Sequence, residues 1–439
     1  MTAIPDGSLE QYVPERDFVG LLESAGADFF RLTGSLQGTA EHRWTKRLYF
    51  LTYTEADELE SFLDDYGARY NQRFCLLTEL VASTRGFSLA GLSLEHLARR
   101  LSGYGVLARL DPSEAARTRD DLSLAAGFVR GSLLRLLGEA RDEAGRLGLA
   151  SPKGPYPGVD AEEPVVRFRL PRNVGSEEIE DEEQRIADVA SKYLQACTML
   201  DEAGVRRCET STECESLRAE SCTEELARVY EATVHNLQST YDTYVKNTVL
   251  EERDERLPHL RGHVSATLHL LEAVTQLAHF VERHESEVRD HAARTRLAQL
   301  VPRSDVNEIT VNRLLYPAHR ILQEARPLAE ALLPSYTNVQ SLEVELADGI
   351  FLHARPASLI VSIVNHFGTP VELEVEGKTC NAGSILELMV VVGSHPEARR
   401  FAFRGDEHPL RDIGLLFQHG LGEAGLDRLP PELGYLRRR

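Results

Sequence analysis

The apolar residues of this sequence change their spacing once, near residue 340. Up to about residue 333 they recur every three or four residues, which is the spacing of amphipathic helices. From Ser341 onward they alternate with polar residues, as in strands that bury one face. Neither pattern fits the other kind of element. The change therefore predicts a large all-α helical bundle region followed by a smaller α+β region. A chain of 439 residues is also too long for one ordinary core, so we expect a multidomain protein.

Two stretches, 1–150 and 184–335, are predicted to be helical, with a linker between them. The linker, 151–183, is rich in Pro and Gly at its start, contains a short strand pattern at 165–170 and ends in an acidic run. The sequence leaves open whether the two helical regions form two bundles or one.

The individual helical patterns follow from apolar spacing and from breaking residues. The patterns run over 17–32, 41–83, 93–101 and 111–147 before the linker, and over 184–202, 222–252, 257–300 and 305–333 after it. Breaks are expected at 84–88, Leu257-Pro258 and Val301-Pro302, because Pro disfavours helix at the residue before it. Pro317 is expected to kink a helix or to begin a new one.

Strand and helix signals alternate over 341–423. Strand patterns lie at 341–347, 371–375, 378–382 and 400–404, and helical patterns follow His353, Ser384 and Asp406. Glu376-Gly377 separates two of the strand patterns and is a hairpin signal. The order is β-α-β-β-α-β-α, which predicts an open-faced sandwich with helices on one face of an antiparallel sheet. Residues 424–439 are assigned to a tail.

His353 stands just ahead of the first of these helical patterns. The first N–H groups of a helix lack internal partners, and the helix dipole adds positive charge there. An anion beside His353 would be well held, and a phosphoryl group is the obvious candidate. Arg355 could offer a planar fork of donors to the same oxygens, and Pro356 fits the first turn of a helix. An imidazole nitrogen is a competent nucleophile near neutral pH, so the motif favours phosphoryl transfer.

The C-terminal region resembles HPr, the histidine-containing phosphocarrier of the bacterial phosphoenolpyruvate-dependent phosphotransferase system. The resemblance is carried by Leu352-His353-Ala354-Arg355-Pro356-Ala357, Glu376-Gly377-Lys378, Ser384-Ile385-Leu386-Glu387-Leu388-Met389, Gly393 and Arg404-Gly405-Asp406-Glu407, in the family's order and spacing. It covers about 341–423. Phe351 stands where the family usually has Gly, and Gly349 lies two residues earlier, so we expect a reshaped loop. No family is recognised for 1–335.

The resemblance implies roles for particular residues. His353 would accept the phosphoryl group on Nδ1, Arg355 would stabilise the phosphohistidine, and no cofactor or metal would be needed. Ser384 falls at the family's regulatory serine, the target of HPr kinase. The family's apolar patch for docking an Enzyme I-like phosphoryl donor falls on Ile385, Leu386 and Met389. Two alternatives stay open: Ser384 as an ordinary N-cap, and the three apolar side chains as core.

Composition limits the other classes of function. The net charge of −20 disfavours nucleic acid as a partner, because binding to a phosphate backbone requires clustered Lys and Arg. The N-terminus has no signal pattern, and no apolar stretch is long enough to span a membrane. We therefore expect a cytoplasmic protein without membrane association, and the sequence gives no prediction of its oligomeric state.

Two clusters in the helical region are candidate metal sites. The first comprises His259, His263, His269, His279, His284 and His291, with Glu272, Glu282 and Glu285; the second comprises Cys197, Cys208, Cys214 and Cys222. The first lacks paired Glu-x-x-His motifs on two helices, and the second lacks Cys-x-x-Cys spacing. Polar helix faces and reduced thiols are the preferred interpretations.

Three hypotheses for function remain. The first is an HPr-family phosphocarrier or regulatory protein, phosphorylated on His353, whose helical region binds a protein partner. The second is an interaction scaffold that uses the HPr-like fold for docking and carries no phosphate. The third is a metal-binding helical enzyme with a regulatory HPr-like domain. The large fused region favours regulation over sugar uptake, and a covalent phosphohistidine carrier over a stand-alone turnover enzyme.

Overall fold

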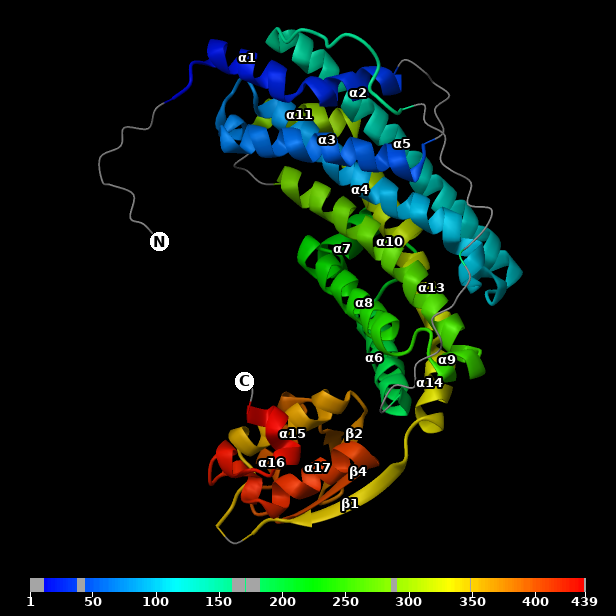
Figure 1. The fold of residues 1–439 in the computed structure, drawn as a ribbon, viewed down its shortest axis with the longest axis vertical. Helices are drawn as coiled ribbons and strands as arrows, with labels where there is room; N and C mark the ends of the chain where they lie inside the picture. The colour runs from blue at the N-terminus through cyan, green and yellow to red at the C-terminus, as the bar shows by residue number, and fades with distance from the viewer. Residues whose placement is uncertain are drawn as a thin grey trace. The chain divides into compact units, whose positions relative to one another are not determined.

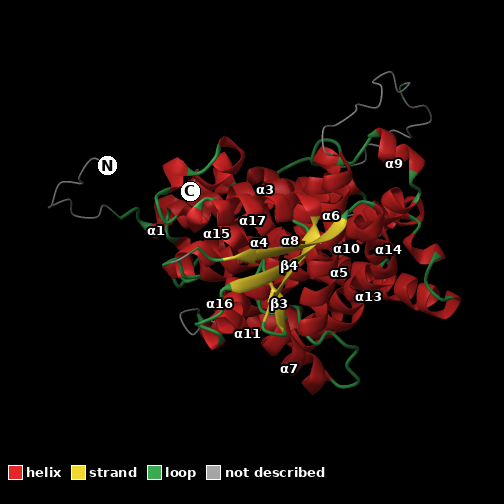
Figure 2. Ribbon diagram, turned by 90° about the horizontal axis from the view of Figure 1, so that it is seen from below, coloured by secondary structure: helices red, strands yellow, loops and turns green. Residues whose placement is uncertain are grey.

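The computed structural model describes residues 12–37, 44–159, 170, 182–285, 290–347 and 349–437. The strand pattern predicted at 165–170, except its last residue, lies outside these residues, as does most of the acidic run that follows it. Within them, most of the chain is helical, and a four-stranded antiparallel sheet lies in the C-terminal part (Figure 1). Figure 2 shows the strands of this sheet side by side. The predicted combination of a large helical region and a small C-terminal sheet is therefore confirmed.

The chain divides into two compact units whose segments alternate along the sequence. One unit comprises Met1–Pro171, Ala203–Glu231 and Ala266–Ile321, and the other comprises Arg172–Glu202, Ala232–Ser265 and Leu322–Arg439. The second unit contains the sheet, together with helical segments that precede it in the sequence.

Among the described residues before the linker, five α-helices form. They are α1 (Glu15–Ala25), α2 (Ala27–Gln37), α3 (Lys46–Asp65), α4 (Cys75–Tyr104) and α5 (Pro112–Leu147). Helix α3 ends just before Gly67, which is left-handed with φ 66°. The break predicted at 84–88 is wrong, because α4 continues through it. Phe87 there is buried and packs edge-on against Phe280. Tertiary burial thus overrides the weak helix propensity of the Gly and Ser residues around it.

The described residues between the linker and the sheet form nine further α-helices. They are α6 (Glu182–Glu202), α7 (Ser211–Ser221), α8 (Glu224–Tyr244), α9 (Val249–Arg253), α10 (Arg256–Glu285), α11 (His291–Leu300), α12 (Arg303–Glu308), α13 (Tyr316–Glu324) and α14 (Arg326–Leu332). A π-helical segment, Ile309–Leu315, joins α12 to α13. The break at Val301-Pro302 is confirmed. The break expected at Leu257-Pro258 is observed three residues earlier, at Asp254-Glu255 between α9 and α10. Pro258 itself lies in the first turn of α10, where a missing N–H costs nothing. Pro317 is the second residue of α13, which follows the π-helical segment without a break, so no separate helix begins at Pro317.

Helix α7 was not predicted, although the sequence carries a signal for it. Thr210 is its N-cap, and its side chain accepts a hydrogen bond from the Glu213 N–H at 3.2 Å. Glu213 in turn accepts from the Glu209 N–H at 2.8 Å. This reciprocal pairing is close to a capping box, and the spacing Thr-x-x-Glu is visible in the sequence.

The C-terminal sheet is built from four short strands. They are β1 (Val339–Glu345), β2 (Val371–Val375), β3 (Lys378–Asn381) and β4 (Arg400–Asp406), in the order β1-β4-β2-β3 with antiparallel neighbours throughout. The β2–β3 turn uses Glu376 and Gly377, both left-handed with φ 49° and 82°. Two such residues in a row match the twist of a two-residue hairpin.

Three helices and the tail share one core with this sheet. The helices are α15 (Ala354–Phe367), α16 (Ile385–Ser394) and α17 (Glu407–Gln418). The core includes Leu373 and Phe403 of the sheet and Ile360 of α15, all fully buried. Leu429, Leu433 and Leu436 of the tail are buried in the same core. The tail therefore packs as part of the C-terminal structure.

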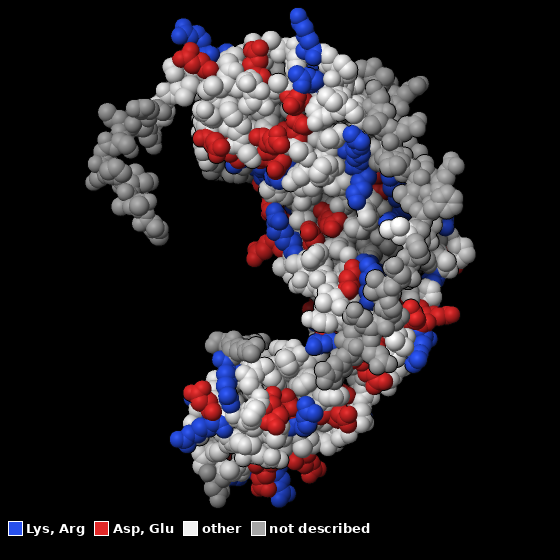
Figure 3. Space-filling view, in the orientation of Figure 1, with Lys and Arg blue, Asp and Glu red and all other residues white. Residues whose placement is uncertain are grey.

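The distribution of charge and the character of the helices limit how the described residues can contact other molecules. On the face shown in Figure 3, the described basic and acidic side chains are interspersed and do not gather by sign. Across the described ranges, no helix combines the length and the apolar character required to span a membrane.

Gly368 gives a test of the local packing. It ends α15 with φ 72°, and a Cβ at this position would lie 1.8 Å from Asp188 Oδ1. Alanine in a left-handed backbone costs about 1–2 kcal/mol. We therefore expect Gly368→Ala to lower the free energy of unfolding of the sheet by at least this amount. Native-state hydrogen exchange of the sheet amides measures this.

Gly393→Ala is the matched control. Gly393 lies in α16 and is not left-handed, and a Cβ added to it would meet no atom within 4 Å. Alanine there should raise the same free energy by about 0.5–1 kcal/mol. Equal effects of the two substitutions would contradict the structure around Gly368.

Candidate functional site

His353 forms the N-cap of α15. Its backbone is extended, with φ −115° and ψ −171°, and its Nδ1 accepts a hydrogen bond from the Arg355 N–H at 3.4 Å. The ring nitrogen thus takes the place of the oxygen that usually caps a helix. The bond is long and therefore weak. Because an accepting nitrogen needs a free lone pair, Nδ1 is unprotonated in this arrangement.

The other ring nitrogen of His353 faces a carboxylate. Nε2 lies 3.1 Å from Glu423 Oε1. A neutral imidazole with a lone pair on Nδ1 carries its proton on Nε2, so Nε2–H donates to Glu423. The carboxylate therefore selects the tautomer that leaves Nδ1 nucleophilic. The imidazole side chain stays 54% exposed, so a partner can reach it.

Glu423 reaches His353 because the chain reverses sharply after α17. Gly420, Leu421 and Gly422 all have left-handed backbones, with φ between 56° and 74°. Leu421 is 1% exposed, and its burial offsets the strain of this conformation. Glu423 was not predicted as a site residue, because its position after the last helix belongs to no motif. The two glycines flanking Leu421 are the local signal of the turn.

The loop before His353 uses Gly349, and not Phe351, for its left-handed turn. Gly349 has φ 78°, whereas Phe351 is not left-handed. Ile350 packs against the core and Leu352 is buried, so the chain is anchored on both sides of Phe351. The phenyl ring is consequently turned outward, and Phe351 is 61% exposed. The left-handed residue of this loop is therefore Gly349, two residues before the position where the resemblance expects Gly.

Arg355 lies in the first turn of α15, and its side chain is exposed. The next two residues, Pro356 and Ala357, are buried and fix this turn against the core. A long flexible guanidinium side chain starting here can reach an anion held at Nδ1. The predicted pair of His353 and Arg355 therefore belongs to one helix end.

Ser384 is the N-cap of α16. Its Oγ accepts from the Glu387 N–H at 3.4 Å, and Glu387 Oε2 accepts from the Asn381 N–H at 3.1 Å. The N-cap alternative is therefore observed. It does not exclude modification, because the residue is only half-buried.

The predicted docking residues differ in exposure. Ile385 is 43% and Leu386 73% exposed, whereas Met389 is partly buried against the core. Val390 is 59% exposed and lies one helical turn from Leu386, so it belongs to the same apolar surface. Val390 was not predicted as part of this surface, although its spacing from Leu386 indicates it.

Three histidines of the first candidate cluster each pair with one carboxylate. His263 Nε2 lies 2.8 Å from Glu324, His269 Nδ1 lies 2.9 Å from Glu272, and His279 Nδ1 lies 2.8 Å from Glu224. Among the residues that the structure describes, no group of three or more His, Cys, Asp or Glu side chains could hold a metal ion.

The cysteines are free and buried. They are Cys75, Cys197, Cys208, Cys214, Cys222 and Cys380. Burial raises the pKa of Cys197 and of Cys222 to about 12, so both thiols stay protonated near neutral pH. These two thiols are therefore poor nucleophiles and poor metal ligands.

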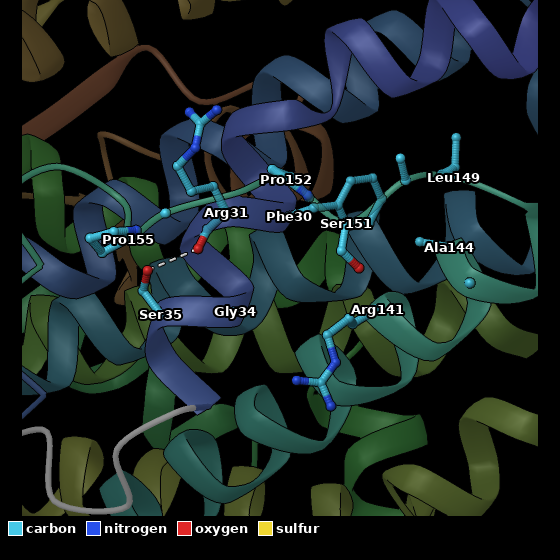
Figure 4. A pocket seen from close by; sticks show the side chains of 13 residues that line it. Phe30, Arg31, Gly34, Ser35, Arg141, Ala144, Leu149, Ser151, Pro152 and Pro155 are labelled. Atoms are coloured by element: carbon cyan, nitrogen blue, oxygen red, sulfur yellow. Dashed lines mark hydrogen bonds between the residues drawn. The ribbon is translucent and has the colours of Figure 1, made fainter.

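A pocket of about 470 Å³ lies between α2, α5 and the residues that follow α5 (Figure 4). Phe30, Leu149 and Pro152 give it an apolar lining. Figure 4 shows the guanidinium groups of Arg31 and Arg141 pointing in different directions. Arg31 is also ion-paired with Asp28. Because the two cations do not converge, the pocket has no clear preference for an anion.

Comparisons with known proteins concern the region around His353. A family model described as the PTS HPr component phosphorylation site matches residues 340–395. The HPr-like protein Crh of Bacillus subtilis (strain 168) is 44% identical over 69 residues, which are 16% of this chain and 79% of that protein. No solved structure matches. The segment matched by the family model contains both His353 and Ser384.

The role of Glu423 can be measured directly on the imidazole. We expect the ¹⁵N spectrum of His353 to show the Nε2–H tautomer, and Glu423→Ala to shift part of the population to Nδ1–H, because the acceptor for Nε2–H is lost. Glu432→Ala removes an exposed carboxylate of the tail and should leave the spectrum unchanged. Identical spectra for both variants would show that Glu423 does not select the tautomer.

Proposed function

Because the chain belongs to the HPr family through its C-terminal segment, we propose that it is a phosphocarrier or regulatory protein that accepts a phosphoryl group on His353. The observation that carries this proposal is the pairing of the imidazole. Its Nδ1 lone pair faces the N-terminus of α15, and its Nε2 faces Glu423. A nucleophile and an anion-binding helix end thus meet at one exposed atom.

The transfer step follows from this arrangement. The Nδ1 lone pair attacks phosphorus, and the N–P bond forms as the bond from phosphorus to the donor breaks. A phosphate oxygen then replaces Nδ1 as the acceptor for the N–H groups of the first turn. Arg355 adds a charge-assisted hydrogen bond. The proton stays on Nε2, hydrogen-bonded to Glu423, and the negative carboxylate of Glu423 balances the positive charge of the phosphorylated ring.

We further propose that the segment 341–423 is an open-faced sandwich with the connectivity β-α-β-β-α-β-α. The observed succession of strands and helices supports this assignment. In such an arrangement all helices lie on one face of the sheet, and the loops that carry His353 and Ser384 are free to meet partners.

The expected partners follow from the exposed groups. An Enzyme I-like protein would donate the phosphoryl group and dock on Ile385 and Leu386. A kinase of the HPr kinase type would modify Ser384. We place these reactions in the bacterial cytoplasm. The helical region would bind a protein whose activity depends on the state of His353.

The acceptor is tested by labelling the full chain with radioactive phosphoenolpyruvate and Enzyme I. We expect acid-labile label on the wild type and none on His353→Ala, because the substitution removes the nucleophilic nitrogen. His419→Ala removes another exposed histidine of the same segment and should label normally. Full labelling of His353→Ala would refute the assignment. No label on any form would favour a docking module that carries no phosphate.

The apolar surface of α16 is tested in the same assay. Leu386→Ser should raise the KM for Enzyme I about five- to thirtyfold, because loss of about 1–2 kcal/mol of apolar contact weakens docking. The rate at saturation should change little, since Leu386 does not touch the imidazole. Leu124→Ser changes a leucine of α5 that is 53% exposed and should leave both values unchanged. An unchanged KM for Leu386→Ser would exclude this docking surface.

A further inference from the structure

One stripe along α6 carries only polar side chains. They are Gln184, Asp188, Ser191, Gln195, Thr198 and Glu202, spaced by three or four residues. Other positions of the helix, such as Ile186 and Tyr193, are buried and apolar. At one end the stripe is itself covered, since Gln184 and Asp188 are 9% and 7% exposed. A buried polar stripe needs polar partners.

Those partners lie at the C-terminal end of α15, within the same compact unit. Gln184 Nε2 donates to the Phe367 carbonyl at 3.1 Å. This carbonyl is among the last of a helix and lacks an internal partner. The Asp188 carboxylate packs directly over Gly368, which has no Cβ to prevent the approach. Lys192 Nζ lies 2.7 Å from Asp188 and compensates its charge.

Further along α6 the stripe separates from the HPr-like segment and leaves a pocket of about 430 Å³. Its polar lining comes from Ser191, Gln195, Thr198 and Glu202 on the α6 side, and from Asn365, Thr369 and Asn381 on the other side. The hydroxyl of Thr369 is buried and has no hydrogen-bond partner among the described residues. The contact between α6 and the HPr-like segment is thus close-packed at one end and separated by a pocket at the other. It is also largely polar, as are interfaces between domains that move relative to one another.

We infer that the polar stripe of α6 is a reversible docking surface for the HPr-like segment, and that negative charge at Ser384 releases it. Ser384 directly follows Gly383, and Gly383 and Glu202 line the same pocket. A phosphoryl group on Ser384 Oγ adds about −1.5 to −2 charges, which are repelled by Glu202. His353 lies at the opposite end of α15 from Gly368, so docking leaves the phosphoryl acceptor exposed.

This inference uses the proposed function only in naming phosphorylation of Ser384 as the source of the charge. Transfer from a nucleoside triphosphate would form the Oγ–P bond and release the nucleoside diphosphate and one proton. An aspartate at position 384 supplies part of the same charge without a kinase. The docking can therefore be tested whether or not His353 is phosphorylated.

The test is a spin-label distance measurement on the full chain. The labels are placed on Glu183→Cys of α6 and Lys378→Cys of β3, both exposed positions, while the six native cysteines are buried. We expect one narrow distance distribution in the otherwise unchanged chain. Ser384→Asp should broaden it and add longer distances. Ser394→Asp places the same charge on an exposed serine at the other end of α16 and should leave the distribution narrow.

Reversing the charge at position 202 tests the cause of the release. Glu202→Lys should remove most of the broadening caused by Ser384→Asp, because the repulsion becomes attraction. A broad distribution in the chain without further substitution would overturn the docking surface itself. A narrow distribution that Ser384→Asp leaves unchanged would overturn release by charge. Phosphoryl labelling of His353 in the same proteins reports separately on the proposed function.

Discussion

The proposed chemistry depends on hydrogen bonds made by the backbone groups at the two ends of α15, which have no partner within the helix. At the N-terminus, the Arg355 N–H points at His353 Nδ1. At the C-terminus, the Phe367 carbonyl accepts from Gln184. A helix leaves such groups unsatisfied at both ends and makes one end suited to anions. One helix thereby supplies a site for a phosphoryl group and, at its far end, a site for another part of the chain.

Apolar packing keeps these ends in place. Ile360 and Ile363 of α15 are fully buried in the core shared with the sheet. A helix anchored in this way cannot rotate about its axis without exposing that face, so His353 and Gly368 keep their orientations. Glu423 depends on the same core, since Leu421, two residues earlier, is buried in it. The chemistry at the imidazole is therefore supported by contacts that lie well away from it.

Local patterns predicted much of this structure. The spacing around His353, the alternation in β2 and the Glu376-Gly377 turn are each encoded within a few residues, and the predicted elements form there. The break expected at 84–88 failed because Phe87 is buried by a residue of a distant helix, and burial outweighed propensity. Glu423 and the stripe of α6 were missed for a related reason. The role of each depends on a partner that is distant in the sequence and that only the fold brings close.

The most direct test of the central claim is the ¹⁵N spectrum of the full chain after phosphorylation. In the structure, Nδ1 is the unprotonated nitrogen and accepts the long hydrogen bond from the Arg355 N–H, whereas the proton is on Nε2, which faces Glu423. We predict coupling between ³¹P and Nδ1 of His353, with Nε2 still protonated. Coupling to Nε2, or phosphate on another residue while His353 stays unmodified, would contradict the account.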